Sequence, residues 1–247
     1  MNILLTGGSG KLGSAIRKSG LFSNLLAPSR EELDIGNEEA VRNYIENHDL
    51  GGIIHAAALV DMATCEKNPA DAIVTNIVGT ANLVRAVLAK NEKMRFVHIS
   101  TDQLYGGGDG NYKETDPLKP HNKYAWTKLG AECAVNLLPN ACMIRTSFFV
   151  PENIIKRYND SPDDMYSSKL QIDELAKNIS IVYSSDIKGP INIGGVRMSS
   201  YERFRKYKPS IKKIKFEELQ KRTPEVHIVR DASLDSTKWK DWLKKNL

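Results

Sequence analysis

The run TGGSGKLG at residues 6–13 constrains the fold of this chain more than any other feature. It follows the strand-like apolar run Ile3-Leu4-Leu5 and opens a helical pattern that continues to about Ser19. Its glycines satisfy two spacings, G-x-G-x-x-G at positions 8, 10 and 13 and G-x-x-G-x-x-G at 7, 10 and 13. Such a turn bends tightly, lets a pyrophosphate approach the backbone and packs a helix closely on a strand. Because the helix amino terminus offers free N–H groups to an anion, the run predicts a dinucleotide-binding turn.

Strand-like and helical patterns alternate along the rest of the chain. Helical spacing of apolar residues appears in several segments, and Asn37 is the expected N-cap of the helix that contains residues 41–45. Continuous apolar strands that alternate with helices are typical of a parallel sheet covered on both faces. Right-handed crossovers then favour an α/β fold with a doubly wound, Rossmann-type parallel sheet. The expected strands lie at 3–5, 25–27, 53–56, 96–100, 142–144 and 191–193, and the expected helices at 14–19, 41–45, 73–87, 124–137 and 172–182.

Charge narrows the class of ligand. The formal net charge is +5 and 26% of the residues are charged, which suits a globular protein with an anionic small ligand. The densest basic stretch, residues 197–222, holds ten Lys or Arg against three Glu. It predicts either a solvated face or attraction for a diphosphate. No recognised motif accompanies it, so we expect no nucleic-acid partner.

The cysteines and apolar segments bear on the compartment. Cys65, Cys133 and Cys142 fit neither a metal site nor a disulfide framework, which favours a reducing compartment. No His, Cys or carboxylate cluster suggests a metal. Met1 leads directly into a strand-like run, and we expect no apolar stretch near the ~20 residues that a bilayer span needs. These features predict a cytoplasmic protein without a membrane partner.

The end of the second strand-like run indicates which dinucleotide binds. An NAD site usually has an acidic residue there, bonded to the ribose hydroxyls. This chain instead reads Pro28-Ser29-Arg30, and acidic residues follow only at 31, 32 and 34. Ser29 and Arg30 would bind a 2′-phosphate, and Lys11 of the glycine loop would reach the same group. We therefore predict NADP(H) as the cofactor, with NAD(H) less favoured.

Three residues near the end of the fourth strand and on the next helix suggest a reaction. Tyr124 and Lys128 are four residues apart, on one face of a helix, and Thr101 follows the strand. Hydride addition to a ketone leaves an alkoxide that needs a proton. A phenol with a pKa near ~10 is a poor acid at neutral pH unless a cation favours its anion. Lys128 can supply that charge, and Thr101 can hydrogen-bond and orient the carbonyl oxygen.

These motifs resemble the extended short-chain dehydrogenase/reductases, and within them the dTDP-4-dehydrorhamnose reductase family. The resemblance is good to about residue 147 and patchy afterwards. Relatives often carry a Trp after the Arg-Thr-Ser run, where this chain has Phe148-Phe149, and the stretch 150–170 looks short. The resembling stretches are residues 5–13, 33–35, 55–58, 76–83, 97–102, 124–132, 144–147 and 233–238.

The resemblance implies an activity, a site and a division of the chain. The expected activity is NADPH-dependent reduction of a nucleotide-linked 4-keto-6-deoxysugar. A nucleotide-sugar epimerase, a non-catalytic NADP-binding regulatory subunit and a homodimer stay open. The expected division is an NADP-binding Rossmann domain of residues 1–148 and 168–195, with a small C-terminal substrate-binding lobe of residues 149–167 and 196–247. The implied catalytic residues are Thr101, Tyr124 and Lys128, and the implied cofactor-binding residues are Gly7, Gly10, Lys11, Leu12, Gly13, Ser29, Arg30, Asp34, Ala56, Ala57, Ala58, Asn76, Tyr124 and Lys128.

One residue separates reduction from the nearest competing reaction. Sugar-nucleotide 4,6-dehydratases resemble this fold and typically carry Thr-Asp-Glu where this chain has Thr101-Asp102-Gln103. Elimination of water uses both carboxylates, one as acid and one as base. The amide of Gln103 cannot act as a base near neutral pH. The sequence therefore predicts reduction rather than dehydration, and it does not separate reduction from epimerization.

Overall fold

The computed structural model describes residues 1–247 and contains one central sheet of six parallel strands. Neighbouring strands follow the order β10-β5-β4-β3-β1-β2, so the chain moves outward from β1 first to one side and then to the other. This order confirms the predicted doubly wound α/β sheet. It places a topological switch point between β1 and β3, where such sheets bind their ligands. The strands are β1 Asn2–Thr6, β2 Leu25–Leu26, β3 Leu50–His55, β4 Arg95–Ile99, β5 Ala141–Arg145 and β10 Gly189–Asn192.

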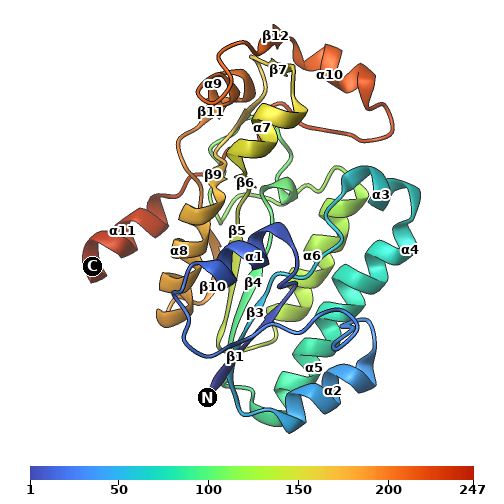
Figure 1. Ribbon diagram of the computed structural model, residues 1–247, viewed down its shortest axis with the longest axis vertical. Coiled ribbons are helices and arrows are strands. Elements are labelled where there is room, and N and C mark those ends of the chain that lie inside the picture. The colour runs from blue at the N-terminus through green and yellow to red at the C-terminus, as the bar shows by residue number, and fades with distance from the viewer.

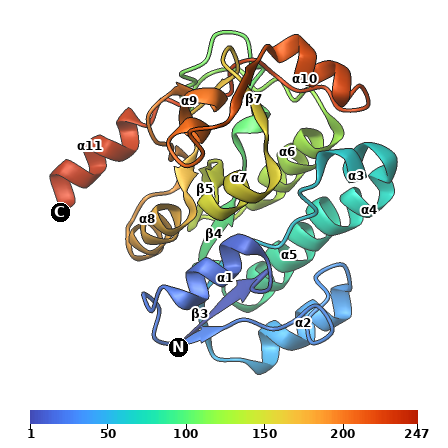
Figure 2. The same cartoon turned by 45° about the horizontal axis from the view of Figure 1, so that its top comes forward.

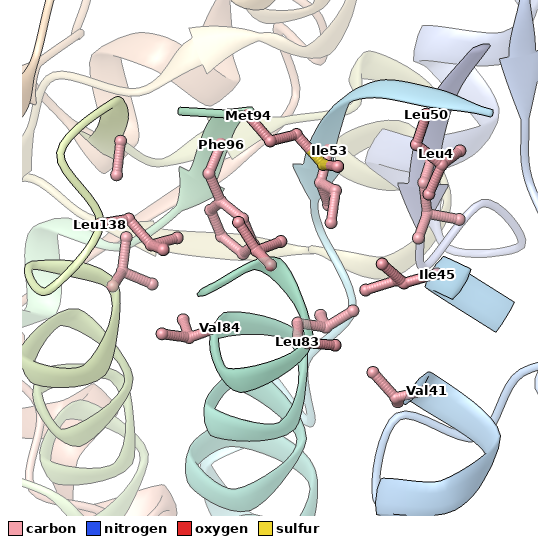
Figure 3. Packing of buried hydrophobic residues seen from close by; sticks show 14 of the residues in the cluster. Leu4, Val41, Ile45, Leu50, Ile53, Leu83, Val84, Met94, Phe96 and Leu138 are labelled. Atoms are coloured by element: carbon pink, nitrogen blue, oxygen red, sulfur yellow. The ribbon is translucent and has the colours of Figure 1, made fainter. Parts of the chain in front are cut away.

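Helices cover both faces of this sheet (Figures 1 and 2). On one face, Leu4, Ile53 and Phe96 pack against apolar side chains of α2 and α5 (Figure 3). On the other, Leu5, Ile54 and their neighbours pack against α1, α8 and α11. The predicted N-cap of α2 is confirmed, since Asn37 Oδ1 accepts a hydrogen bond from the Ala40 N–H at 3.0 Å. The first face carries α2 Glu38–Asn47, α5 Gly79–Asn91 and α6 Lys123–Val135, and the second carries α1 Lys11–Lys18, α8 Ile172–Ser184 and α11 Thr237–Asn246.

One helical stretch is longer and more apolar than expected. After α3 (Met62–Lys67), the segments α4 (Pro69–Ala72), η1 (Ile73–Val78, a π-helical segment) and α5 form a 23-residue helix. By length and composition alone this helix is able to cross a membrane, so the expectation that no such stretch exists is wrong. Half of its apolar window is buried, and it contacts α2 and α6. These contacts are those of a helix that covers a sheet.

A smaller lobe lies beyond the carboxyl ends of the central strands, at the top of Figure 1. It is built from three two-stranded sheets and short helices. The pairs are β6 (Phe148–Phe149) with β9 (Leu170–Gln171), β7 (Asp160–Pro162) with β12 (Lys212–Ile214), and β8 (Tyr166–Ser167) with β11 (Met198–Ser199). The helices are α7 Pro151–Arg157, α9 Ser200–Arg205 and α10 Phe216–Arg222.

Basic side chains of the stretch 197–222 are partly paired within this lobe. Lys213 and Lys215 both contact Asp163, at 3.4 and 2.9 Å, and Arg222 contacts Asp160 at 2.8 Å. Surface pairs of this kind add little stability. They do neutralise part of the positive charge, which favours the interpretation of the stretch as a solvated face.

The end of the chain returns to the central sheet. Trp239 on α11 is 3% exposed, packs into the core of the second face and donates from Nε1 to Asn178 Oδ1 at 3.2 Å. Residues 237–246 therefore contact the Rossmann part, although the predicted division assigns them to the lobe. The two-part division itself remains our proposal.

Candidate functional site

Two adjoining cavities lie along the carboxyl ends of β1, β3 and β4. The first has a volume of about 240 Å³ and reaches from the glycine loop to Ser29, Arg30 and Asp34. The second, of about 430 Å³, contains Thr101, Tyr124 and Lys128. Both are lined by Gly7, Gly10, Ala56 and Ala58, so they are continuous along the edge of the sheet. The structure thus brings together nearly all of the predicted cofactor-binding and catalytic residues.

The glycine loop lies too close to its neighbours to carry side chains. Gly7 has φ +74°, and a Cβ atom there would lie 2.6 Å from the Ala57 nitrogen. A Cβ atom on Gly13 would lie 2.2 Å from the Gly7 carbonyl oxygen. Gly10 lies at the N-cap position of α1 and has no side chain to cap the helix. The N–H groups of the first turn therefore remain available to a ligand. This arrangement fits the pyrophosphate of a dinucleotide, with the helix dipole favouring the negative charge.

The predicted 2′-phosphate residues are only partly brought together. Ser29 and Arg30 both line the first cavity. The Ser29 N–H donates to Glu32 Oε2 at 2.7 Å, while the Arg30 side chain is 79% exposed and 3.8 Å from Asp34. Lys11 lines the second cavity instead of the first. The structure therefore leaves Arg30 as the exposed cation at this end and does not place Lys11 beside it.

Tyr124 and Thr101 are neighbours in the second cavity. Helix α6 begins at Lys123 because the Asn122 side chain accepts from the Ala125 N–H, at 2.8 Å. This buries Tyr124 against the residues after β4. Burial raises the pKa of Tyr124, the hydrogen bond with the Thr101 side chain lowers it, and the nearby charge of Asp102 raises it. At neutral pH Tyr124 is therefore fully protonated, as an acid must be before it donates.

Lys128 lies one turn further along α6 and is 2% exposed. Its ammonium donates to the Ile99 carbonyl oxygen at 2.8 Å and lies 3.1 Å from His98 Nε2. Burial lowers the pKa of Lys128 to about 8, and Glu132 one turn later opposes this shift. The pKa of Tyr124 is raised overall, so burial outweighs the lowering that was expected from a nearby cation.

A buried carboxyl group forms another part of the second cavity. Asp102 is 1% exposed, and burial raises its pKa, while hydrogen bonds from Ser147, Gln103 and Thr101 and the nearby charge of Lys169 lower it. Gln103 Nε2 donates to Asp102 Oδ1 at 2.8 Å. Ser147 and Lys169 line the cavity without having been predicted. Ser147 belongs to the Arg-Thr-Ser run that carried the resemblance, whereas no sequence pattern marks Lys169.

Asn76 supports the site without lining either cavity. It lies in the π-helical segment, is 1% exposed and donates from Nδ2 to Thr127 Oγ1 at 2.8 Å. The same amide bonds both the N–H and the carbonyl of Leu59, at 2.8 and 3.0 Å. Asn76 therefore ties α6 to the loop after β3, rather than contacting the cofactor cavity as the predicted list implied.

Comparison with known proteins places these features in a family. A family model described as RmlD substrate binding domain matches residues 1–160. The dTDP-4-dehydrorhamnose reductase of Aggregatibacter actinomycetemcomitans is 30% identical over 202 residues, which cover 78% of this chain and 64% of that protein. The chain spans less than two thirds of the length of the first curated relatives it matches.

Two solved structures share the whole fold. A hypothetical dTDP-4-dehydrorhamnose reductase from Sulfolobus tokodaii superposes with a TM-score of 0.87 at 27% identity, covering 98% of this chain and 94% of that one. The dTDP-4-dehydrorhamnose reductase from Bacillus anthracis, in complex with NADP, superposes with a TM-score of 0.88 at 21% identity, covering 100% and 94%. At that identity the second structure supports the fold alone.

The buried ammonium makes stability depend on pH. Replacing Lys128 by Met should raise the free energy of unfolding at pH 7 by about 1–2 kcal/mol. The folded pKa is lowered to about 8, whereas an unfolded Lys titrates near ~10.4. Between these values the unfolded chain binds more protons, so the unmodified protein gains stability as pH rises and the advantage of Lys128→Met shrinks.

Urea unfolding at pH 7 and at about pH 9.5 measures this difference. Lys177→Met on the exposed face of α8 is the matched control and should change stability little at either pH. An equal effect of Lys128→Met at both pH values would contradict the lowered pKa.

Proposed function

The chain belongs to the RmlD substrate-binding-domain family, and from this membership and the site geometry we propose that it is an NADPH-dependent reductase of a nucleotide-linked 4-keto-6-deoxysugar. The family agrees with the resemblance predicted from the sequence. One observation carries the proposal: Thr101, Tyr124 and Lys128 line a cavity that is continuous with the glycine-loop cavity. A dinucleotide that lay along both would bring its reactive end to these three side chains.

Residues of both cavities would hold the cofactor. The uncapped first turn of α1, which lines the second cavity, would bind the pyrophosphate, and Ser29 and Arg30 of the first cavity would bind the 2′-phosphate. The acidic side chains nearby are already engaged, Glu32 with the Ser29 N–H and Asp34 with the Gly36 N–H at 2.9 Å. NADPH bound in this way supplies the hydride to the carbonyl carbon of the sugar.

The protein supplies the proton and holds the carbonyl. Thr101 and Tyr124 donate hydrogen bonds to the ketone oxygen, and the Tyr124 proton transfers to that oxygen as negative charge develops on it. The raised pKa of Tyr124 makes the tyrosinate costly. The Lys128 ammonium lies in the same cavity and lowers that cost as the proton leaves. One hydride and one proton are added, so the product is an alcohol heavier by two hydrogens.

The alternatives differ in what the second cavity must contain. Dehydration needs two carboxylates, and Gln103 occupies the second position with its amide bonded to Asp102. Epimerization is compatible with the same trio and with a cofactor that is not exchanged. A regulatory subunit would bind the dinucleotide without turnover. The assembled trio favours an enzyme, and product analysis separates the two enzymatic readings.

Loss of the tyrosine hydroxyl should abolish turnover without unfolding the protein. For Tyr124→Phe we expect kcat to fall by ~10²-fold or more, with NADPH affinity nearly unchanged, because a proton donor is removed and little packing is lost. Mass spectrometry of a panel of nucleotide-linked keto-sugars, run beside NADPH absorbance, measures the reaction. Tyr44→Phe on α2 is the control and should retain activity.

The product mass decides among the proposals. An increase of two hydrogens with matching NADPH loss supports reduction. An unchanged mass with a new stereoisomer would establish epimerization. Dehydration is tested separately with a nucleotide-hexose, from which a product lighter by one water would establish it. NADPH binding without turnover of any keto-sugar would favour the regulatory subunit.

Arg30 should set the preference between the two dinucleotides. We expect Arg30→Asp to weaken NADPH binding by about tenfold or more and to leave NADH binding equal or better, because a repulsive carboxylate replaces the cation. Fluorescence titration of both dinucleotides gives the ratio. Arg42→Asp on the exposed side of α2 is the control. Tighter binding of NADH than NADPH by the unmodified protein would remove the basis of the NADP assignment.

We also propose a cytoplasmic homodimer. The three cysteines are free, which fits a reducing compartment. Trp126 and Leu137 at α6 are 58% and 68% exposed, and Cys133 between them is exposed as well. An exposed apolar stripe of this kind, along α6 and the turn that follows it, is the surface that a second copy would cover.

A charge in this stripe should dissociate the dimer. Trp126→Glu is expected to sediment as a monomer at concentrations where the unmodified chain sediments as a dimer. Val196→Glu, at an exposed apolar position of the lobe, is the control and should remain dimeric. A monomeric unmodified chain would contradict the homodimer and leave the catalytic proposal untouched.

A further inference from the structure

A line of polar side chains crosses the core directly beneath Lys128. Thr6, His55 and His98 are register partners on the neighbouring strands β1, β3 and β4. All three are buried, at 3%, 1% and 0% exposure. The His55 and His98 rings are 5.1 Å apart. Polar groups in this position must be hydrogen-bonded, and the pattern of their bonds fixes which ring nitrogens carry hydrogen.

Both nitrogens of His55 are already used. The Thr80 hydroxyl donates to the Asn76 carbonyl oxygen at 2.6 Å, so it can only accept from His55 Nε2, at 2.9 Å. His55 Nδ1 then accepts from the Thr6 hydroxyl at 2.7 Å. This ring is neutral and saturated, and burial lowers its pKa to about 3. Neither nitrogen of His55 is therefore free to accept a hydrogen bond from Lys128.

His98 has the opposite arrangement. Its Nε2 lies 3.1 Å from Lys128 Nζ, and an ammonium group can only donate. Nε2 must therefore accept, which places the hydrogen on Nδ1, where no partner is present. An unpartnered buried N–H is costly. His98 thus accepts a hydrogen bond from Lys128 at Nε2, and its Nδ1–H is left without an acceptor.

We propose that His98 is a positioning residue for Lys128: together with the Ile99 carbonyl it takes two of the three ammonium protons and directs the third into the reaction cavity. The geometry leaves the ammonium little freedom, since both acceptors are consecutive residues of β4. In the proposed reaction, on which this role rests, His98 would keep the cation close to Tyr124 while the phenol gives up its proton.

The charge on Lys128 depends on few other groups. His55 from β3 and His98 from β4 are neutral, and Tyr124 one turn earlier on α6 is protonated. Glu132 one turn later is the facing carboxylate, and it is held by Arg145 at 2.7 Å and Ser100 at 2.5 Å. Replacing His98 would therefore remove a hydrogen bond that stabilises the charged ammonium. This loss would lower the pKa of Lys128.

The test is a titration of Lys128 in the free protein by NMR, with ¹³C-labelled lysine. The Lys128 resonance is identified by its absence in Lys128→Met, and its midpoint near pH 8 stands apart from ordinary lysines near ~10.4. In His98→Leu we expect this midpoint to fall by about one unit or more, because a charge-assisted hydrogen bond to a buried ammonium is lost. In His98→Gln, whose amide oxygen reaches the Nε2 position, the midpoint should return close to the original value.

Met143→Leu is the matched control, since Met143 is the register partner of His98 on β5 and is equally buried. It should leave the midpoint unchanged. If the protein turns over a keto-sugar, the alkaline limb of its kcat profile should move with the NMR midpoint in each variant. The NMR result stands without any activity, so failure of the proposed reaction is distinguishable from failure of this role.

Two outcomes would overturn the role of His98. One is an unshifted Lys128 midpoint in His98→Leu, and the other is an equal shift in His98→Leu and His98→Gln. If His98→Leu does not fold, His98→Asn replaces it, because its amide is too short to reach the ammonium. In the unmodified protein, ¹⁵N histidine spectra should show His98 neutral with its hydrogen on Nδ1 at about pH 6 to 7, where Lys128 is charged. A hydrogen on Nε2 would exclude the bond.

Discussion

The absence of side chains at Gly7 and Gly13 is the constraint on which the rest of the site depends. The turn after β1 presses against the backbone at Ala57, and α1 presses against the turn, at distances that no Cβ atom would tolerate. Because of these two close contacts, the switch point between β1 and β3 is bounded by one continuous wall of backbone. Because the same wall borders both cavities, a ligand that binds the glycine loop is directed toward the end of β4. The proposed cofactor site and the proposed catalytic site thus share one piece of backbone.

A second constraint keeps α6 in place. Tyr124, Lys128 and Glu132 follow one another at four-residue spacing and lie on one face of the helix. Glu132 and Arg145 form a buried ion pair, and Arg145 also donates to the Tyr105 hydroxyl at 2.9 Å. Burying such a pair contributes little net stability, but breaking it by removing one partner is strongly destabilising. The pair therefore fixes the position of α6 against β5, and with it the face that carries Tyr124 and Lys128.

Much of this architecture is readable from the sequence because it depends on local patterns. Apolar runs and helical spacing predicted all six central strands and the sheet class, and position in the alternation distinguished the Tyr124–Lys128 pair from a chance spacing. The π-helical segment was not predictable, since a local widening of the helix leaves no periodic trace. Its consequence is that Asn76 bonds α6 and the loop after β3 instead of facing the cofactor cavity.

Rotamers and long-range contacts account for the remaining differences at the site. The sequence places Lys11 in the glycine loop but not on a particular side of it, and the structure turns it toward the second cavity. Likewise, four-residue spacing puts Lys128 beside Tyr124, but only the fold shows that His98 and Ile99 bind the ammonium. Lys169 is brought to the cavity by the pairing of β6 with β9, strands too short for any periodicity to show.

The site therefore divides between two kinds of structure. The proposed hydride and proton transfer lies at the end of the central sheet, where Thr6, His55 and Lys128 have buried hydrogen-bond partners. The wall that would meet the sugar comes from Ser147, Phe148 and Lys169, at the edge of the short-stranded lobe. The lobe is also the part whose sequence departs from the resembling family. A change of substrate can thus arise there without disturbing the Thr101–Tyr124–Lys128 trio, which explains why the reaction class follows from this sequence more directly than the identity of the sugar.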